Sequence, residues 1–400
     1  MNHRLIFAST GRSPWLLYIG WAARTSAAAC LAIVALAAAN ARAETGVTDA
    51  TVTIGQSAVF SGPVADTGNH YRSGIELYFD KVNRAGGVNG RKLQLIALDD
   101  AYDPKRTAEN THTLIEQNKV FALIGYTATA NLIAAMPIAE AAKVPMFAPL
   151  VGTTSFRQKH NRYLFHVRAS YQNELSHIVQ QLAVIGSDNV AVVYQDSVFG
   201  KSNLDTLLPL LEAQKLKVAK TLPMAINATS AADIATQVAQ AKAGAIIMIM
   251  AGKMSEVLIR DLKASGIGST VYTISVGVVD AKAAAGRLNG ALRGVVTASI
   301  VPSPKLDRYA IVKEYHRALA ASDAKTDNYT VLEGFIAAKV FTEGLRRAGR
   351  TPTREGFITA IEGLGRYDLG DFRVEYGPNN HNGSNFVELE MYTNEGSLIR

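Results

Sequence analysis

The sequence predicts an α/β protein of two Rossmann-like lobes, whose parallel-type sheets are joined by a multi-strand hinge. From Val52 onward, short apolar runs typical of strands alternate with segments whose apolar residues recur at helical spacing. The runs at 122–125 and 144–148 contain no charged residue, which indicates strands covered on both faces, as in a parallel sheet. After Ser170 a second alternating set begins, so we expect a second sheet.

The first alternating set begins the first lobe. We expect strands at 51–60, 91–99, 122–125, 144–148 and 163–170. Helices are expected at 71–83, from Pro104 onward and at 130–142. Pro104 is compatible with a first helical turn, where its missing N–H has no intrahelical acceptor. These segments place residues 44–167 in the N-terminal lobe.

The second alternating set predicts the C-terminal lobe, after which the chain returns to the first. Strands are expected at 190–194, 216–222, 245–250 and 271–274, with helices at 174–185, 200–214, 231–243 and 254–265. A strand at 295–301 would carry the chain back, and helices at 306–321, 329–348 and 353–362 would cover the first lobe. The turn-rich segment 377–384 then leads to a strand at 386–392. We therefore expect lobes of 44–167 plus 301–385 and 168–300 plus 386–400.

The first 43 residues have the pattern of a secretory signal peptide. Arg4, Arg12 and Arg24 precede a short apolar run at 27–39, and an A-x-A site ends at Ala43. The run is too short for a membrane span. Cleavage after Ala43 would remove the only cysteine, Cys30, and we expect a periplasmic protein without disulfides or direct membrane insertion.

Composition and motifs exclude several classes of function. No dense Lys/Arg run indicates nucleic-acid binding, and the histidines lack metal-ligand spacing, so we expect neither nucleic acid, metal nor cofactor. No G-x-S-x-G, P-loop or H-E-x-x-H motif indicates an enzyme. Asp99 and Asp100 are adjacent at a strand end and point to opposite faces, so we expect one to cap and the other to be solvated.

Two consecutive strand ends between Ala122 and Thr154 form the candidate binding site. Thr127 and Thr129 follow the first strand and are typical N-cap residues, while Gly152 and Thr153 follow the second. Two such ends side by side would present hydroxyls, free N–H groups and a helix N-terminus to one point, which attracts a carboxylate. The alternative is that Thr129 and Thr153 only cap helices.

Several motifs resemble those of one known family. The segment 83–93 resembles the N-x-x-GG-[IV]-x-G-[RK]-x-[IL] turn of the leucine/isoleucine/valine-binding proteins, which are type I periplasmic binding proteins of ABC importers. Segments 61–63, 99–104, 194–200 and 333–338 also match this family in order. The resemblance implies a monomer that binds a small-molecule carboxylate and delivers it to an ABC permease at the inner membrane.

The resemblance also implies binding residues. The ligand carboxylate would be held at Ala128 and Thr129 and by the loop Leu150, Gly152 and Thr153. The aromatic residues expected beside the ligand side chain are Tyr171, Phe199 and Phe335, each with the alternative of a core position.

Two departures from the family bear on the ligand. Tyr102 and Ala128 stand where amino-acid binders have a disulfide, and Ser275 stands near the glutamate that receives the ligand's ammonium. The nearest acid, Asp280, is expected to cap a helix. An amine-lacking acid, including an aromatic one, therefore fits at least as well as a branched-chain amino acid, because a buried ammonium without a carboxylate is costly.

Three alternatives stay open from the sequence. Arg168 and Lys253 would add positive charge at the rim of the site, or would be solvated side chains. The protein would serve a permease, or be a sensor of the same fold that presents ligand to a receptor or regulator. An α/β enzyme is the remaining alternative.

Overall fold

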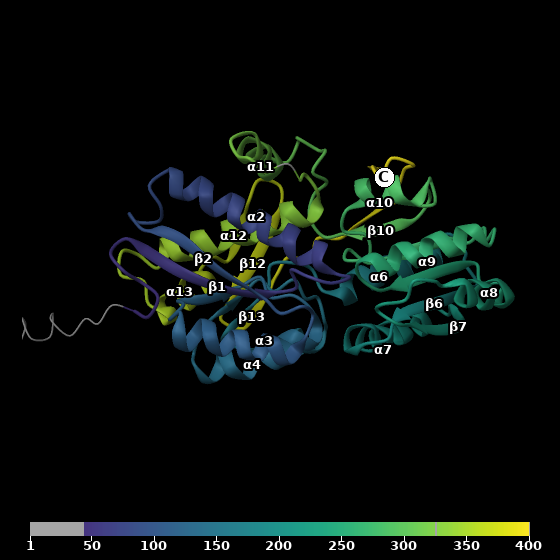
Figure 1. Cartoon of the computed structure of the whole chain (residues 1–400), viewed down its shortest axis with the longest axis horizontal. Coiled ribbons are helices and arrows are strands. Elements are labelled where there is room, and N and C mark those ends of the chain that lie inside the picture. The colour runs from purple at the N-terminus through teal and green to yellow at the C-terminus, as the bar shows by residue number, and fades with distance from the viewer. Residues whose placement is uncertain (1–43, 325, 400) are drawn as a thin grey trace, which may run out of the picture. The chain divides into compact units, whose positions relative to one another are not determined.

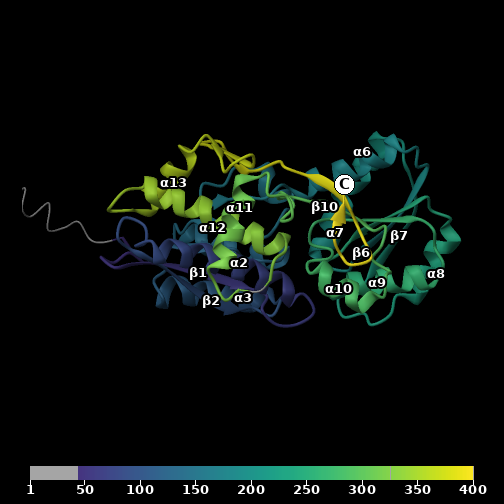
Figure 2. The ribbon, with the colours of Figure 1, turned by 90° about the horizontal axis from the view of Figure 1, so that it is seen from above.

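The computed structural model describes residues 44–324 and 326–399, in which two mainly parallel sheets are each covered by helices (Figures 1 and 2). The predicted signal peptide lies outside the described residues. None of the helices in the described residues combines the length and hydropathy that a membrane span requires.

The first sheet has five parallel strands in the order β2-β1-β3-β4-β5. Its strands are β1 (Thr51–Ala58), β2 (Lys92–Asp99), β3 (Ala122–Ile124), β4 (Met146–Phe147) and β5 (Leu164–Phe165). All five were expected, but β4 is shorter than 144–148. Pro145 and Pro149 flank it without ladder N–H groups, and Ala148 has a φ of +49°, so the chain leaves the sheet there.

Helices cover both faces of this sheet (Figure 1). They include α2 (Ala65–Arg84), α3 (Pro104–His112), which continues into a π-helical turn η1 (Thr113–Gln117), α4 (Thr129–Ala141) and the short α5 (Ser155–Gln158). Helix α2 starts before the expected residue 71, because its polar first turns carry little apolar periodicity. Gly68 lets that turn lie against β1's exit: an added Cβ would be 2.0 Å from the Val59 carbonyl oxygen.

The second sheet has seven strands in the order β15-β14-β10-β9-β8-β6-β7. They are β6 (Asn189–Gln195), β7 (Lys217–Met224), β8 (Ala245–Ile249), β9 (Thr270–Thr273), β10 (Val296–Ser299), β14 (Glu388–Tyr392) and β15 (Leu398–Ile399). Strands β6 to β10 are parallel, whereas β14 and β15 are antiparallel. The parallel strands β6, β8, β9 and β10 are central and mostly buried, whereas β7 is an edge strand that carries two lysines.

The helices of this half follow the strands in chain order. They are α6 (Tyr171–Val184), α7 (Val198–Ala213), α8 (Ala232–Ala241), α9 (Lys253–Ala264) and α10 (Ala281–Leu288). The sequence predicted that Asp280 caps a helix but gave no bounds for α10. Asp280 caps it by accepting a hydrogen bond from the Ala283 N–H at 3.0 Å, which confirms the capping role expected for this acid.

The chain returns to the first sheet through three helices and a small third sheet. These are α11 (Ala310–Ala320), α12 (Tyr329–Arg347), α13 (Arg354–Glu362), β11 (Arg366–Asp368), β12 (Arg373–Gly377) and β13 (Asn380–Gly383). The helix α12 lies on α2 at close range: a Cβ at Gly334 would be 2.1 Å from the Tyr71 carbonyl oxygen. The sequence described 377–384 as turn-rich and predicted none of these three strands; β13 pairs with β12 within this segment, and its sequence Asn-His-Asn-Gly carries no apolar alternation.

Candidate functional site

The two predicted strand exits meet. Thr129 is the first residue of α4 and Thr153 lies in the loop after β4; their Oγ1 atoms are 2.7 Å apart and both residues are buried. A parallel bridge between Thr127 and Leu150 holds the two loops side by side, with the Leu150 N–H donating to the Tyr126 carbonyl at 2.8 Å. The structure therefore brings two hydroxyls to one point at the carboxyl ends of β3 and β4.

Neither threonine near α4 is its N-cap, which corrects the sequence interpretation. Ala128 holds that position with a φ of +67°, and no side chain caps the helix. The Thr127 hydroxyl instead accepts a hydrogen bond from the Val59 N–H at 3.0 Å, and so ties the β1 exit to the β3 exit. The positive φ at Ala128 turns the chain sharply enough that the helix starts directly beside Thr153.

A small cavity lies at this point, which we call the threonine cavity. Its volume is about 30 Å³, close to that of one water molecule. It is lined by Val59, Val64, Thr67, Tyr102, Thr127, Ala128, Thr129, Leu150, Tyr171, Phe199, Ala251 and Val276. None of these side chains is charged. The first eight follow or cover the five-stranded sheet, and the last four belong to the seven-stranded half.

Five of the predicted site residues line the threonine cavity: Ala128, Thr129, Leu150, Tyr171 and Phe199. The rings of Tyr171 and Phe199 meet edge to face with centroids 5.4 Å apart. Two more predicted residues support it from behind. Thr153 bonds Thr129, and Gly152 accepts a hydrogen bond from the Tyr171 N–H at 2.8 Å.

Two predicted site residues lie elsewhere. Phe335 is fully buried in α12 and packs edge to face on Tyr78 at 4.9 Å and on Tyr315 at 5.5 Å, which is the core position that the sequence left as its alternative. Ser275 follows β9 and lines a different, larger cavity.

Tyr102 is a cavity residue that the sequence did not predict. It has a φ of +69°, and its hydroxyl accepts a hydrogen bond from Gln195 Nε2 at 2.9 Å. Gln195 ends β6, so this bond joins loops of the two sheets. A second link joins them where the Lys253 N–H donates to the Pro63 carbonyl at 3.2 Å. In the sequence, the only feature that pointed to Tyr102 was that it and Ala128 stand where amino-acid binders of the family have a disulfide.

Asp99 and Asp100 shape the loop that carries Tyr102. Asp99 accepts from the Phe60 N–H at 2.9 Å and from Ser61 Oγ at 2.6 Å, and these bonds hold its pKa below the ordinary value although burial opposes them. Asp100 is fully buried and accepts from Ser57 Oγ and the Tyr102 N–H. Asp100 is therefore the buried member of the pair, whereas Asp99 stays partly exposed while it accepts these hydrogen bonds.

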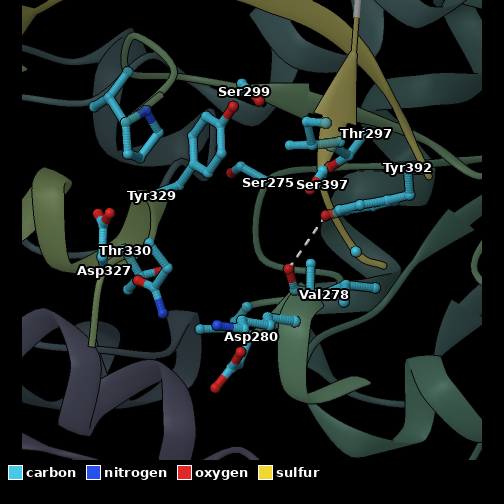
Figure 3. A pocket seen from close by; sticks show the side chains of 18 of the residues that line it. Ser275, Val278, Asp280, Thr297, Ser299, Asp327, Tyr329, Thr330, Tyr392 and Ser397 are labelled. Carbon is cyan, nitrogen blue, oxygen red and sulfur yellow. Dashed lines mark hydrogen bonds between the residues drawn. The ribbon is translucent and has the colours of Figure 1, made fainter. Parts of the chain in front are cut away.

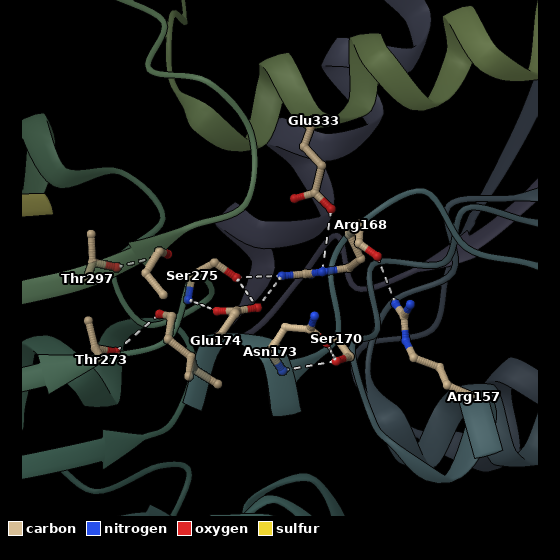
Figure 4. Close-up of polar contacts among 11 residues, drawn as sticks. Arg157, Arg168, Ser170, Asn173, Glu174, Thr273, Ser275, Thr297 and Glu333 are labelled. Carbon is tan, nitrogen blue, oxygen red and sulfur yellow. Dashed lines mark hydrogen bonds and ion pairs between the residues drawn. The ribbon is translucent and has the colours of Figure 1, made fainter. Parts of the chain in front are cut away.

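A buried charged cluster lies beside the cavity and joins the two halves (Figure 4). Arg168 is 2% exposed, and its guanidinium lies 3.4 Å from Glu174 Oε1 and 3.7 Å from Glu333 Oε1. Its Nη2 also donates to Ser275 Oγ. The alternative that Arg168 is a solvated side chain is wrong; Lys253, by contrast, is exposed.

Glu174 occupies the surroundings of Ser275, where the sequence showed no acid. Its Oε2 accepts from the Ser275 N–H at 2.7 Å and its Oε1 from Ser275 Oγ at 3.0 Å. Burial raises the pKa of Glu174 to about 7, with Arg168 and the two Ser275 hydrogen bonds opposing the shift. Sequence reasoning missed this acid because it comes from α6, a hundred residues before Ser275.

The larger cavity has a volume of about 830 Å³ and lies between the loop after β9, strand β10, the start of α12 and the C-terminal hairpin (Figure 3). Ser275, Asp280, Thr297, Ser299, Asp327, Tyr329, Thr330, Glu333, Tyr392 and Ser397 are among its lining residues. Because Glu333 lines it and also contacts Arg168, we call it the glutamate cavity. No group of three or more His, Cys, Asp or Glu in residues 44–324 and 326–399 is arranged to hold a metal ion.

Comparison with known proteins shows which family this chain is similar to. A family model described as periplasmic binding protein matches residues 51–389. A substrate-binding periplasmic protein from Ralstonia solanacearum is 29% identical with a TM-score of 0.81, over 87% of this chain and 99% of that one. A possible leucine/isoleucine/valine-binding protein from Rhodopirellula baltica SH 1 is 26% identical with a TM-score of 0.81, over 89% and 98%.

Among curated relatives, Leu/Ile/Val-binding protein homolog 8 of Brucella abortus (strain 2308) is 29% identical over 162 residues. These residues are 38% of this chain and 40% of that protein, so the match spans less than half of the relative's length. The family as a whole consists of periplasmic proteins that bind small molecules and work with ABC transporters, rather than of enzymes. The chain belongs to the periplasmic binding protein family, as its resemblance to the leucine/isoleucine/valine-binding proteins predicts.

Proposed function

We propose that this protein is the substrate-binding component of an ABC importer and that it closes on a small carboxylate without an ammonium group. The observation that carries the proposal is the threonine cavity: the Thr129 hydroxyl, which is bonded to Thr153 behind it, and an uncapped helix start face two aromatic rings, with no charged side chain in the lining. A hydrophobic acid, aromatic or branched, matches both ends of this cavity.

The carboxylate end is supported by the donors around Thr129. The first N–H groups of α4 have no side-chain acceptor, and the positive end of the helix dipole favours an anion there. The Thr129 and Thr153 hydroxyls now bond each other, and each can donate to a carboxylate oxygen instead. Hydrogen bonds to a charged acceptor contribute about 1.5–3 kcal/mol each, so two or three of them and one aromatic contact reach the micromolar range, about −8 kcal/mol.

The absence of an ammonium is argued from the acids near the cavity. Glu174 is a buried carboxylate on α6, the helix whose first residue lines the cavity, and its oxygens already accept from Ser275 and face Arg168. It does not line the threonine cavity. An ammonium buried there would lose its hydration without gaining an ionic partner, which costs several kcal/mol.

Binding requires the cavity to open, because about 30 Å³ holds no organic acid. Its walls come from the two predicted lobes, 44–167 plus 301–385 and 168–300 plus 386–400. The contacts between Tyr102 and Gln195 and between Lys253 and Pro63 would break on opening and form again over the ligand. A ligand that touches both walls favours the closed arrangement by its differential contacts.

Export and delivery complete the proposal. Residues 1–43 would direct the chain to the periplasm as a signal peptide, with cleavage after Ala43. The mature monomer would then pass its ligand to an inner-membrane permease. We propose no cofactor for the binding protein.

Calorimetry with matched acids tests the proposal. We expect 4-methylpentanoate to bind at least as tightly as leucine, and 3-phenylpropanoate at least as tightly as phenylalanine. Thr129→Val, which keeps the shape and removes the hydroxyl, should weaken the binding of the acid by about tenfold or more. Thr236→Val is the matched control, because that exposed hydroxyl on α8 bonds only the Ala232 carbonyl of its own helix.

Two outcomes would contradict the proposal in different ways. A clear preference for leucine over 4-methylpentanoate would show that an ammonium is recognised. An unchanged affinity in Thr129→Val would remove this hydroxyl from the carboxylate site.

A further inference from the structure

We propose that the glutamate cavity is a second binding site, which takes a compact organic cation with a primary ammonium group, and that Glu333 is its anionic partner. This site is separate from the threonine cavity and does not depend on the function proposed for that cavity.

The first observation is the incomplete bonding of Glu333. The residue is 6% exposed on α12, and its Oε1 atom accepts no hydrogen bond. Its cationic neighbour is Arg168, whose Nε is 3.7 Å from that oxygen, longer than a hydrogen bond. Burial raises the pKa of Glu333 and Arg168 opposes this rise. This oxygen faces Arg168 and has only the long ionic contact on that side, so a donor that reached the carboxylate from the cavity would be stabilising.

The second observation is the charge of the cluster. Arg168 is one cation between two carboxylates, Glu174 and Glu333. Glu174 is fully engaged, since it accepts two hydrogen bonds from Ser275 and faces Arg168. At a pH above about 7, where Glu174 is ionised, the two carboxylates exceed the one cation by one negative charge, and Glu333 is the member of the pair that lines the cavity. A cation placed in the cavity would balance this charge.

The third observation is the size and lining of the cavity. About 830 Å³ lies within the range of small-molecule sites. Four acids line it (Asp280, Asp327, Glu333 and Glu395), against two lysines (Lys282 and Lys305). The ring of Tyr329 and the side chain of Thr297 lie beside the hollow in Figure 3 and offer aromatic and polar contacts to the rest of a ligand, whereas the Tyr329 hydroxyl donates to Glu390.

These observations favour an ammonium over a neutral ligand. A primary ammonium carries three donors, one for Glu333 and others for neighbouring hydroxyl oxygens. A neutral hydroxyl of the same shape would supply the hydrogen bond and leave the excess charge unbalanced. An anion would add to that charge.

Benzylamine and benzyl alcohol are matched probes for this difference. With the wild-type protein, we expect calorimetry to show benzylamine binding at least about tenfold more tightly than benzyl alcohol. Glu333→Gln should remove this preference. The control Glu343→Gln lies on the same helix, but its carboxylate bonds Arg346 and Arg347, so benzylamine binding should be unchanged.

Methyl NMR locates the probe without any variant. With labelled valine methyl groups, benzylamine should shift the signals of Val278, Val279 and Val301, which line the glutamate cavity. The signals of Val59 and Val64, which line the threonine cavity, should not move. Thr129→Val should bind benzylamine as the wild type does, so failure of one site is distinguishable from failure of the other.

Three results would overturn the proposal: equal affinity for the amine and the alcohol, no saturable benzylamine binding in the millimolar range, or shifts confined to Val59 and Val64. If Glu333→Gln does not fold, as judged by its thermal melt, the wild-type probe pair and the valine signals still decide.

Discussion

The two cavities lie close in the molecule but differ in chemistry. The threonine cavity is small and is lined by no charged side chain, whereas the glutamate cavity is large and has four acids in its wall. The change takes place within one step of the backbone, since Ser275 lines the glutamate cavity and Val276 lines the threonine cavity. Because an uncharged and an acidic cavity lie so near to each other, the side chains between them decide whether a charge in one is felt in the other.

Arg168 and the residues that it contacts lie between the two cavities. The guanidinium lies over the ring of Tyr171, 5.2 Å from its centroid, and that ring lines the threonine cavity. Its other contacts are Glu174, Ser275 and Glu333, of which the last two line the glutamate cavity. One buried cation thus faces an aromatic wall on one side and carboxylates on the other. The predictions below test how far this arrangement keeps the two cavities independent.

The largest effect is expected for Arg168→Met. The change keeps the length of the side chain and leaves Glu174 and Glu333 buried without a cation. Breaking a buried ion pair from one side costs about 3–5 kcal/mol, and we expect the free energy of unfolding to fall by that amount in urea titrations.

Two further variants sharpen this result. Arg162→Met removes an exposed ion pair with Glu355 and should change the free energy of unfolding by less than about 1 kcal/mol. Adding Glu174→Gln to Arg168→Met should restore part of the loss, because one of the two stranded charges is gone. A single variant as stable as the wild type would show that Arg168 does not neutralise these carboxylates.

A smaller effect is expected in the pH dependence of stability, through Glu174. Burial, opposed by Arg168 and Ser275, raises its pKa to about 7 in the folded protein, above the ordinary value of 4.5. Between these two values the folded state binds more protons than the unfolded state, so this group makes stability fall as pH rises from about 4.5 to about 7.

The comparison of wild type and Glu174→Gln isolates this contribution. We expect the difference in free energy of unfolding between the two proteins to shift by about 1–3 kcal/mol from pH 4.5 to pH 7.5 in favour of the variant, since a glutamine cannot ionise. Urea titrations at each pH measure it. A constant difference over this range would show that Glu174 titrates normally in the folded protein.

The sequence predicted the threonine cavity better than the glutamate cavity because of where their residues lie. Thr129, Leu150 and Thr153 follow consecutive parallel strands. The carboxyl ends of parallel strands lie at the same edge of a sheet, so these residues come close together. Most strands and helices were predicted for a related reason: the spacing of apolar residues that identifies each element lies within its own segment.

The contacts that the sequence did not predict join distant segments of the chain. Arg168 and Glu333 are 165 positions apart in the numbering, and neither has a local pattern that predicts an ion pair. Likewise, Glu174 reaches Ser275 only once α6 packs beside the loop after β9. The strand β13 was missed because its pairing with β12, and not its polar sequence, makes it a strand.

The smallest effect is expected for Tyr102→Phe, and it tests whether closure of the threonine cavity is felt at the glutamate cavity. The change removes the hydroxyl that accepts from Gln195 Nε2 and leaves the ring in the cavity wall. Losing one such hydrogen bond costs about 1 kcal/mol, so we expect the affinity for 4-methylpentanoate to fall about fivefold in calorimetry. The affinity for benzylamine should not change, because Tyr102 does not line the glutamate cavity. If both affinities fell together, closure would act on the two cavities as one unit, and Arg168 would not separate them.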